Sequence, residues 1–75
     1  MKPLNIKGII KSWGWRIVRL DHTLPSFADL INISRTNLSH YISGRASPKI
    51  ETIELIENSI RRMEERTNVE ERDHE

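Results

Sequence analysis

The stretch of residues 23–43 constrains the fold more than any other part of the chain, because it carries start and stop signals for two short helices. Thr23 is a suitable N-cap, and Pro25 falls in the first turn, where a helix needs no backbone N–H. Asn32 tolerates the left-handed backbone conformation, so it can end the first helix and begin a turn. Ser34 is then the N-cap of the second helix. The pattern predicts two helices separated by a tight turn.

The second helix, predicted over residues 35–43, has two chemically different faces at about 100° per residue. Its apolar residues are Leu38, Tyr41 and Ile42. A further apolar set lies on the first helix and in the turn: Phe27, Ala28, Leu30, Ile31 and Ile33. Its outward residues are Thr36, Ser39, His40 and Ser43, with Arg35 at the leading edge and Asn37 at the flank. None of the outward residues is a carboxylate. This face therefore suits base edges and phosphates better than open solvent.

These residues resemble the helix-turn-helix of the Cro/lambda-repressor-like family of small bacterial and phage regulators. With Leu24 as the first of twenty positions, Ala28 is fifth, Asn32 is ninth (where the family usually has Gly), and Ile33, Leu38 and Tyr41 are tenth, fifteenth and eighteenth. Residues 43–53, SGRASPKIETI, resemble the family's following loop and next helix start, so the likeness covers about thirty residues. At the first position the family commonly has Gln, which contacts the DNA backbone, whereas this chain has Leu24. The arginines that the family carries in the first helix of its domain cannot be aligned with this chain without a gap, so no residue role is carried over from them.

The resemblance implies an all-α fold, a compact lambda-repressor-like DNA-binding domain of four helices, with five as an alternative, over residues 1–66. A further helix is predicted N-terminal to the helix-turn-helix, after a cap at Asn5. It has an amphipathic apolar stripe of Ile6, Ile9, Ile10, Trp13, Ile17 and Leu20. Gly8 and Gly14 each weaken it by about 1 kcal/mol relative to Ala, which leaves open a break near Gly14. Trp15 falls opposite the stripe, either covered by neighbouring Lys and Arg stems or in an interface.

A last helix is predicted over about residues 49–66, after Gly44 and Pro48. Its heptad-like seam comprises Ile53, Ile56, Ile60 and Met63, with Ile50 and Leu55 on either side. We expect Ile56, Ile60 and Met63 to pack against a second copy of the chain, the alternative being that the helix simply docks on its own domain. Residues 67–75, TNVEERDHE, are predicted to form an acidic, solvated tail.

Composition limits the protein to one small domain of 75 residues, whose core would be marginal on its own, so dimerisation is a reasonable route to stability. There are no cysteines, and neither a signal peptide nor a membrane span is evident, so a cytoplasmic protein of a bacterial or phage-infected cell is expected.

The net charge is only +1, but residues 1–49 carry eight Lys/Arg and two Asp, a net +6, whereas residues 50–75 carry a net −5. This asymmetry points to a polyanionic partner on one side, unless it is a chance partition.

No enzyme, cofactor or metal site is expected, because His22, His40 and His74 lack ligand spacing and no nucleophile faces a base. We predict instead a Cro-type repressor that binds a palindromic operator as a homodimer, with half-sites about 34–36 Å apart. The predicted base contacts are Arg35 to guanine, Thr36 to a thymine methyl or base edge, and Asn37, Ser39 and His40. The predicted phosphate contacts are Lys2, Lys7, Ser26, Ser43, Arg45 and Lys49, together with the backbone N–H groups around Pro25–Ser26.

Two alternatives remain open on sequence alone. One is an antitoxin-type or restriction-controller autoregulator, which would share the DNA chemistry but also bind a protein partner through Trp15 or the acidic tail. The other is a helix-turn-helix used only for protein–protein contact, whose outward face would not need to be free of acidic residues.

Overall fold

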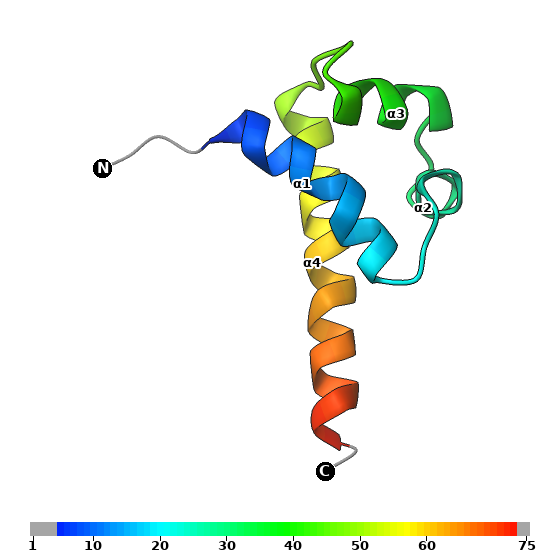
Figure 1. The fold of residues 1–75 in the computed structure, drawn as a ribbon, viewed down its shortest axis with the longest axis vertical. Coiled ribbons are helices and arrows are strands. Elements are labelled where there is room, and N and C mark those ends of the chain that lie inside the picture. Colours follow the sequence, from blue (N-terminus) through cyan, green and yellow to red (C-terminus); the bar gives the residue numbers. More distant parts are fainter. Residues whose placement is uncertain (1–4, 74–75) are drawn as a thin grey trace.

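The computed structural model describes residues 5–73, with side chains from residue 5 to residue 67, and these residues form four α-helices (Figure 1). The helices are α1 (Ile6–Arg19), α2 (Leu24–Leu30), α3 (Arg35–Ser43) and α4 (Ile50–Asp73). The predicted all-α class is confirmed, with four helices in the described part of the chain. α3 lies at one end of the molecule, and the C-terminal end of α4 lies at the opposite end (Figure 1).

α1 is a single continuous helix, so the break considered at Gly14 does not occur. Its N-cap is Asn5, whose side-chain oxygen accepts the backbone N–H of Gly8 at 3.0 Å. A glycine inside a helix costs only about 1 kcal/mol. Trp13 and Ile17, on either side of Gly14, are both fully buried, and the burial of two such large side chains outweighs that cost.

The turn between α2 and α3 has the predicted chemistry. Thr23 Oγ1 accepts the backbone N–H of Ser26 at 3.2 Å, and Ser34 Oγ accepts the backbone N–H of Asn37 at 3.2 Å. Asn32 has a φ of 61°, the left-handed conformation that lets the chain leave α2 sharply. These caps and the turn fix where α3 begins.

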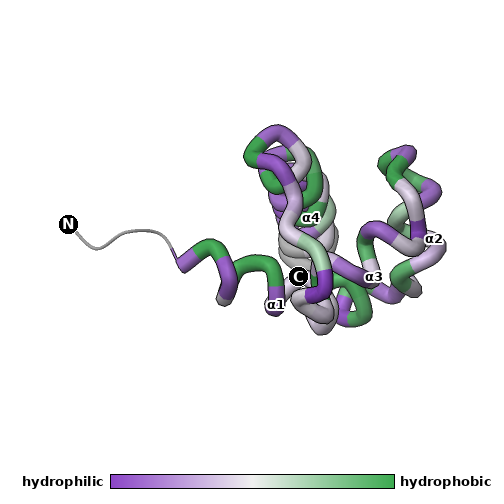
Figure 2. Tube along the Cα trace, turned by 90° about the horizontal axis from the view of Figure 1, so that it is seen from above, coloured by the Kyte–Doolittle hydropathy of each residue, from purple (hydrophilic) through white to green (hydrophobic). Residues whose placement is uncertain are grey.

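The core consists of seven fully buried residues drawn from all four helices: Trp13, Ile17, Phe27, Ala28, Leu38, Ile56 and Ile60. Hydrophobic and hydrophilic residues alternate along the helices (Figure 2), as expected for elements that each bury one face. Within the described residues α1 contacts the other three helices and α2 contacts α3, whereas the backbones of α2 and α4 do not approach each other.

An ionic network joins α1 to α4, and the sequence patterns gave no hint of it. The Arg16 guanidinium donates to both carboxylate oxygens of Glu57, at 2.8 and 3.1 Å, and to both of Glu64, at 3.0 and 2.9 Å. The indole N–H of Trp13 also donates to Glu57, at 3.1 Å. Arg16 therefore ties the middle of α1 to two positions of α4 that lie about two helical turns apart.

α4 extends to Asp73, beyond the predicted end at about Arg66. The polar segment after Arg66 was interpreted as a solvated tail because it lacks apolar periodicity. It contains no Gly or Pro, however, and Glu and Arg are good helix formers, so nothing stops the helix there. Residues 74 and 75 of the predicted tail lie outside the described part of the chain.

Three apolar residues lie elsewhere than predicted. Ile56 and Ile60 are fully buried within the single chain, so the prediction that they contact a second copy is wrong: Trp13, Phe27 and their neighbours already cover them. Leu30 was predicted on the apolar face of its helix with Phe27 and Ala28, but 58% of it is exposed, because no backbone of α4 approaches α2 on that side.

Candidate nucleic-acid interface

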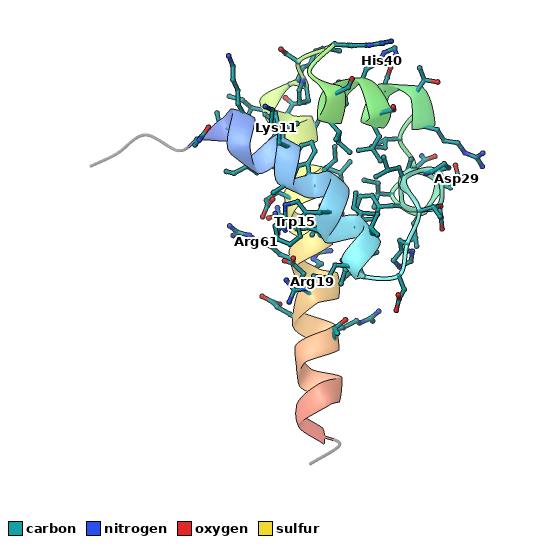
Figure 3. The ribbon with its side chains drawn as sticks, in the orientation of Figure 1. Lys11, Trp15, Arg19, Asp29, His40 and Arg61 are labelled. Atoms are coloured by element: carbon teal, nitrogen blue, oxygen red, sulfur yellow. The ribbon has the colours of Figure 1, made fainter. Side chains whose placement is uncertain are left out.

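The outward face of α3 is open to solvent along its whole length. Arg35, Thr36, Asn37 and Ser39 are exposed, and His40 is half-buried. His40 lies on the side of α3 that points away from the rest of the molecule (Figure 3). This face carries no carboxylate, and the acidic C-terminal half of α4 lies at the other end of the fold rather than over it (Figure 1).

The inward face of α3 fixes the helix on the core. Leu38 is fully buried, and Tyr41 and Ile42 are half-buried against the same core. A Cβ added at Gly14 of α1 would lie 3.5 Å from Ile42 Cγ2, so α1 passes at van der Waals distance from α3. At its C-terminal end α3 closes on Gly44, at a φ of 83°, and the N–H of Arg45 donates to the carbonyl of His40 at 2.9 Å. The helix is therefore held rigidly with its polar side outward.

Arg35 is not free in the isolated chain. Its Nε donates to Asp29 Oδ1 at 2.9 Å and its Nη2 donates to Asp29 Oδ2, which links the first residue of α3 to α2. The hydrogen bond to Arg35 lowers the pKa of Asp29, and the same bond raises the pKa of Arg35. Asp29 was not among the predicted site residues, because the prediction of an acid-free face rests on the residues of α3 alone. Its signal in the sequence was an acidic residue one turn before the helix-turn-helix corner.

Most of the predicted phosphate contacts lie at the C-terminal end of α3, in the loop that follows it, and beside that loop on α1. Lys7, Ser43, Arg45 and Lys49 are all exposed. A hollow of about 220 Å³ separates the start of α1 from the loop after α3, and its lining includes Lys7, Lys11, Gly44 and Ser47. Lys11 was not predicted and joins the basic residues on this side. Lys2 lies outside the described residues.

At the start of α2, the prediction that the backbone N–H of Ser26 contacts a phosphate is wrong. The backbone N–H of Ser26, proposed as a phosphate donor, already donates to Thr23 Oγ1, so only the exposed Ser26 side chain is available. The cap that makes the helix start is what removes the N–H from use.

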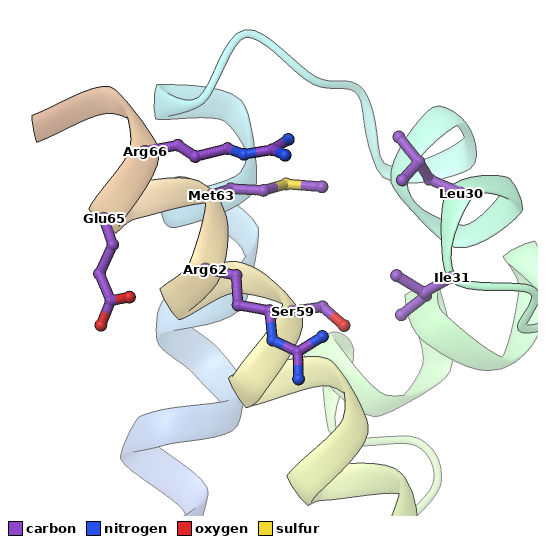
Figure 4. Close-up of a pocket in the computed structure, with 7 residues that line it drawn as sticks. All are labelled: Leu30, Ile31, Ser59, Arg62, Met63, Glu65 and Arg66. Atoms are coloured by element: carbon purple, nitrogen blue, oxygen red, sulfur yellow. The ribbon is translucent and has the colours of Figure 1, made fainter. Parts of the chain in front are cut away.

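A groove of about 690 Å³ lies between α2 and α4, away from the face of α3. Leu30 and Ile31 form one wall, and Met63 and Arg66 of α4 point toward them across the groove (Figure 4). Met63, a predicted dimer contact, is half-buried and retains surface in this groove.

The described residues form neither a metal-binding cluster nor a membrane-spanning helix. No three His, Asp or Glu side chains lie together as they would around a metal ion. None of the helices there combines the length and apolar character of a transmembrane span.

Comparison with known proteins gives one match. A family model described as helix-turn-helix matches residues 16–68, which is more than two thirds of the chain and includes α2, α3 and most of α4. Searches of curated proteins and of solved structures returned no match.

Proposed function

Because the chain belongs to the helix-turn-helix family of DNA-binding regulatory domains, we propose that it is a transcription regulator that reads double-stranded DNA with α3 in the major groove. The observation that carries the proposal is the exposed, carboxylate-free face of α3. An α-helix fits the major groove of B-DNA, and hydroxyl, amide, imidazole and guanidinium groups are the groups that hydrogen-bond base edges there.

Base reading falls to the residues along that face. Arg35, at the N-terminal end of α3, is assigned a bidentate contact to guanine, and Thr36 a contact to a thymine methyl or a base edge. Asn37, Ser39 and His40 complete the reading face, some of them through bridging water.

The flanking cations supply affinity that does not depend on sequence. Arg45 and Lys49 lie in the loop that follows α3, and Lys7 and Lys11 lie beside that loop on α1. Each phosphate that such a residue neutralises releases counterions, so binding falls as the salt concentration rises. The hydroxyls of Ser26 and Ser43, at the start of α2 and the end of α3, are assigned to phosphates as well.

The assembly on DNA is proposed to be a homodimer on a palindromic operator, as in a Cro-type repressor, to which residues 24–53 show the likeness described above. The groove between α2 and α4 is the surface that favours a second copy. Its apolar wall includes exposed Leu30 and half-buried Met63, and the rim carries Arg62 and Arg66 together with Glu65. A rim with both signs of charge is self-complementary across a two-fold axis, where Arg of one copy can face Glu of the other.

Substitution of Leu30 tests the dimer. Leu30→Asp places a charge in the groove without emptying the core, so it should convert a dimer to a monomer in sedimentation equilibrium. Leu55→Asp is the matched control, because Leu55 is 44% exposed on α4 but does not line the groove. A dimer that persists in Leu30→Asp would exclude the groove as the interface.

Selection from a pool of random duplexes tests the DNA-binding function. The expected outcome is an enriched inverted repeat whose half-site centres are about one helical turn apart, bound in mobility-shift assays with an affinity that falls with salt. Failure of the wild-type chain to shift any duplex at low salt would contradict the proposal and favour a domain used for protein–protein contact.

One observation favours a second candidate, an autoregulator of the antitoxin or restriction-controller type that also binds a protein. Trp15 is 57% exposed on α1, between exposed Lys11 and Arg19, one turn away on either side. Tryptophan and arginine are both enriched at protein–protein interfaces. Capture of a host protein by the wild-type chain and not by Trp15→Ala would support this candidate; equal capture by both would exclude Trp15 from such an interface.

A further inference from the structure

The pair formed by Asp29 and Arg35 adds little to stability, which directs attention to what else it does. The two side chains are 54% and 63% exposed, and exposed ion pairs contribute little because water and salt screen them. A carboxylate beside a DNA-reading face also repels phosphates unless it is neutralised. Its place is therefore better explained by its effect on Arg35 than by its effect on folding.

The geometry shows which guanidinium donors the carboxylate uses. Asp29 accepts from Nε and from Nη2, which together form the side-on fork of the guanidinium. Arginine has five N–H donors in a fixed plane, so both N–H groups of Nη1 and the second N–H of Nη2 remain. One N–H of Nη1 and the remaining N–H of Nη2 form the end-on fork, which can reach the O6 and N7 atoms of a guanine.

The pair also limits where that free fork can point. Asp29 belongs to α2 and Arg35 to α3, and both helices are fixed on the core through Phe27, Ala28 and Leu38. A long side chain bound at its guanidinium by a second helix populates this rotamer more often, before DNA arrives, than an unpaired side chain would. That part of the ordering no longer has to occur on binding, which is the general advantage of a preorganised contact.

From this geometry we infer that Asp29 is a specificity-determining positioning residue, which holds the Arg35 guanidinium by its side-on fork so that the end-on fork reads a guanine in the major groove. The inference rests on the proposed function. Asp29 acts through Arg35, so its removal alters the preference for one base pair and not only overall affinity. Loss of its negative charge also relieves repulsion of phosphates, so binding to mismatched sites strengthens while discrimination falls.

The test uses four duplexes built on the enriched operator that differ only at the base pair where Arg35→Ala relaxes preference. Dissociation constants for the full chain give the ratio between guanine and the other bases. Asp29→Ala should lower this ratio about three- to tenfold, the size expected when one long side chain must be ordered on binding. In the Arg35→Ala background the same substitution should leave the ratio unchanged, because the effect passes through Arg35.

Two further variants separate positioning from charge and from shape. Glu54→Ala removes one exposed carboxylate from α4 and should change affinity for all four duplexes alike. Asp29→Asn keeps the shape of the side chain but only one acceptor oxygen, so it should fall between wild type and Asp29→Ala. An unchanged ratio in Asp29→Ala, or an equal drop with Arg35 already removed, would overturn the inference while leaving the DNA-binding function intact. No binding of any duplex by the wild-type chain would overturn both.

Discussion

Replacement of Arg16 by Met should destabilise the fold, because it removes the guanidinium that joins α1 to α4. The side chains of Arg16 and Glu57 are each only 13% exposed, and Glu64 is 35% exposed. Met fills similar space without the charge, so Arg16→Met leaves Glu57 and Glu64 partly buried without their main cation. Breaking a fully buried pair costs about 3–5 kcal/mol. Since these groups retain some contact with water, we expect about 2–3 kcal/mol.

That loss is a large part of the total. A chain of 75 residues is stabilised by roughly 4–11 kcal/mol at typical values per residue. At about 4–8 °C for each kcal/mol in a domain of this size, Arg16→Met should melt about 10–20 °C below wild type. Circular dichroism at 222 nm during thermal and urea unfolding measures both quantities.

Arg61→Met is the matched control, because Arg61 donates to the same carboxylate, at 2.8 Å to Glu57 Oε2, but is 67% exposed. Exposed pairs of this kind contribute below about 1 kcal/mol. Equal losses in the two variants would refute the argument that burial makes the Arg16 network important.

The pH dependence gives an independent check on the same network. Hydrogen bonds to Arg16 lower the pKa values of both Glu57 and Glu64. Because the folded-state pKa lies below the unfolded one, this stabilisation is complete above about pH 4.5 and is lost as the pH falls through the folded pKa values. The difference in unfolding free energy between wild type and Arg16→Met should thus be constant near neutral pH and shrink below about pH 4. A difference that stays constant into that acid range would contradict the assigned cause.

The remaining predictions concern DNA contacts and backbone conformation. Arg35→Ala should weaken operator binding by about 1–3 kcal/mol and relax preference at one base pair, whereas Arg45→Ala should weaken binding to all duplexes alike and reduce the salt slope by about one. Fluorescence anisotropy measures both. Equal losses of affinity for operator and random DNA in Arg35→Ala would exclude Arg35 from base reading. Gly14→Ala should stabilise the protein by about 0.5–1 kcal/mol, since its Cβ would make only ordinary contact with α3. Gly44→Ala should destabilise it by about 1–2 kcal/mol because of the positive φ. Thermal melts compare the glycine variants, and a loss in the first or a gain in the second would show that the backbone argument is wrong.

Local signals in the sequence predicted the helix-turn-helix well, because caps and turns are encoded by single residues. Thr23 and Ser34 cap their helices through their own side chains, and Asn32 takes the left-handed conformation at the turn. The separation of Leu38 from the outward residues of α3 follows directly from helical periodicity. These features depend on neighbours in the chain, so a single sequence was enough.

Features that depend on distant parts of the chain were not predictable in the same way. Glu57 and Glu64 lie more than forty positions from Arg16, and nothing in their spacing indicates which arginine they meet. Periodicity placed Ile60 on the apolar seam of its helix. It could not distinguish a residue that faces its own domain from one that faces a second copy. Leu30 shows the converse: the pattern grouped it with the apolar residues Phe27 and Ala28, which are buried, whereas Leu30 lies at the wall of an open groove.

Methylation interference on the selected operator tests most directly whether α3 lies in the major groove. Dimethyl sulfate modifies guanine at N7, in the major groove, and adenine at N3, in the minor groove, so one experiment reports on both grooves. If α3 lies in the major groove, methylation of a guanine N7 in each half-site should prevent binding, and Arg35→Ala should abolish the interference at that guanine. Interference confined to adenine N3, or none at any guanine N7, would contradict this placement of α3.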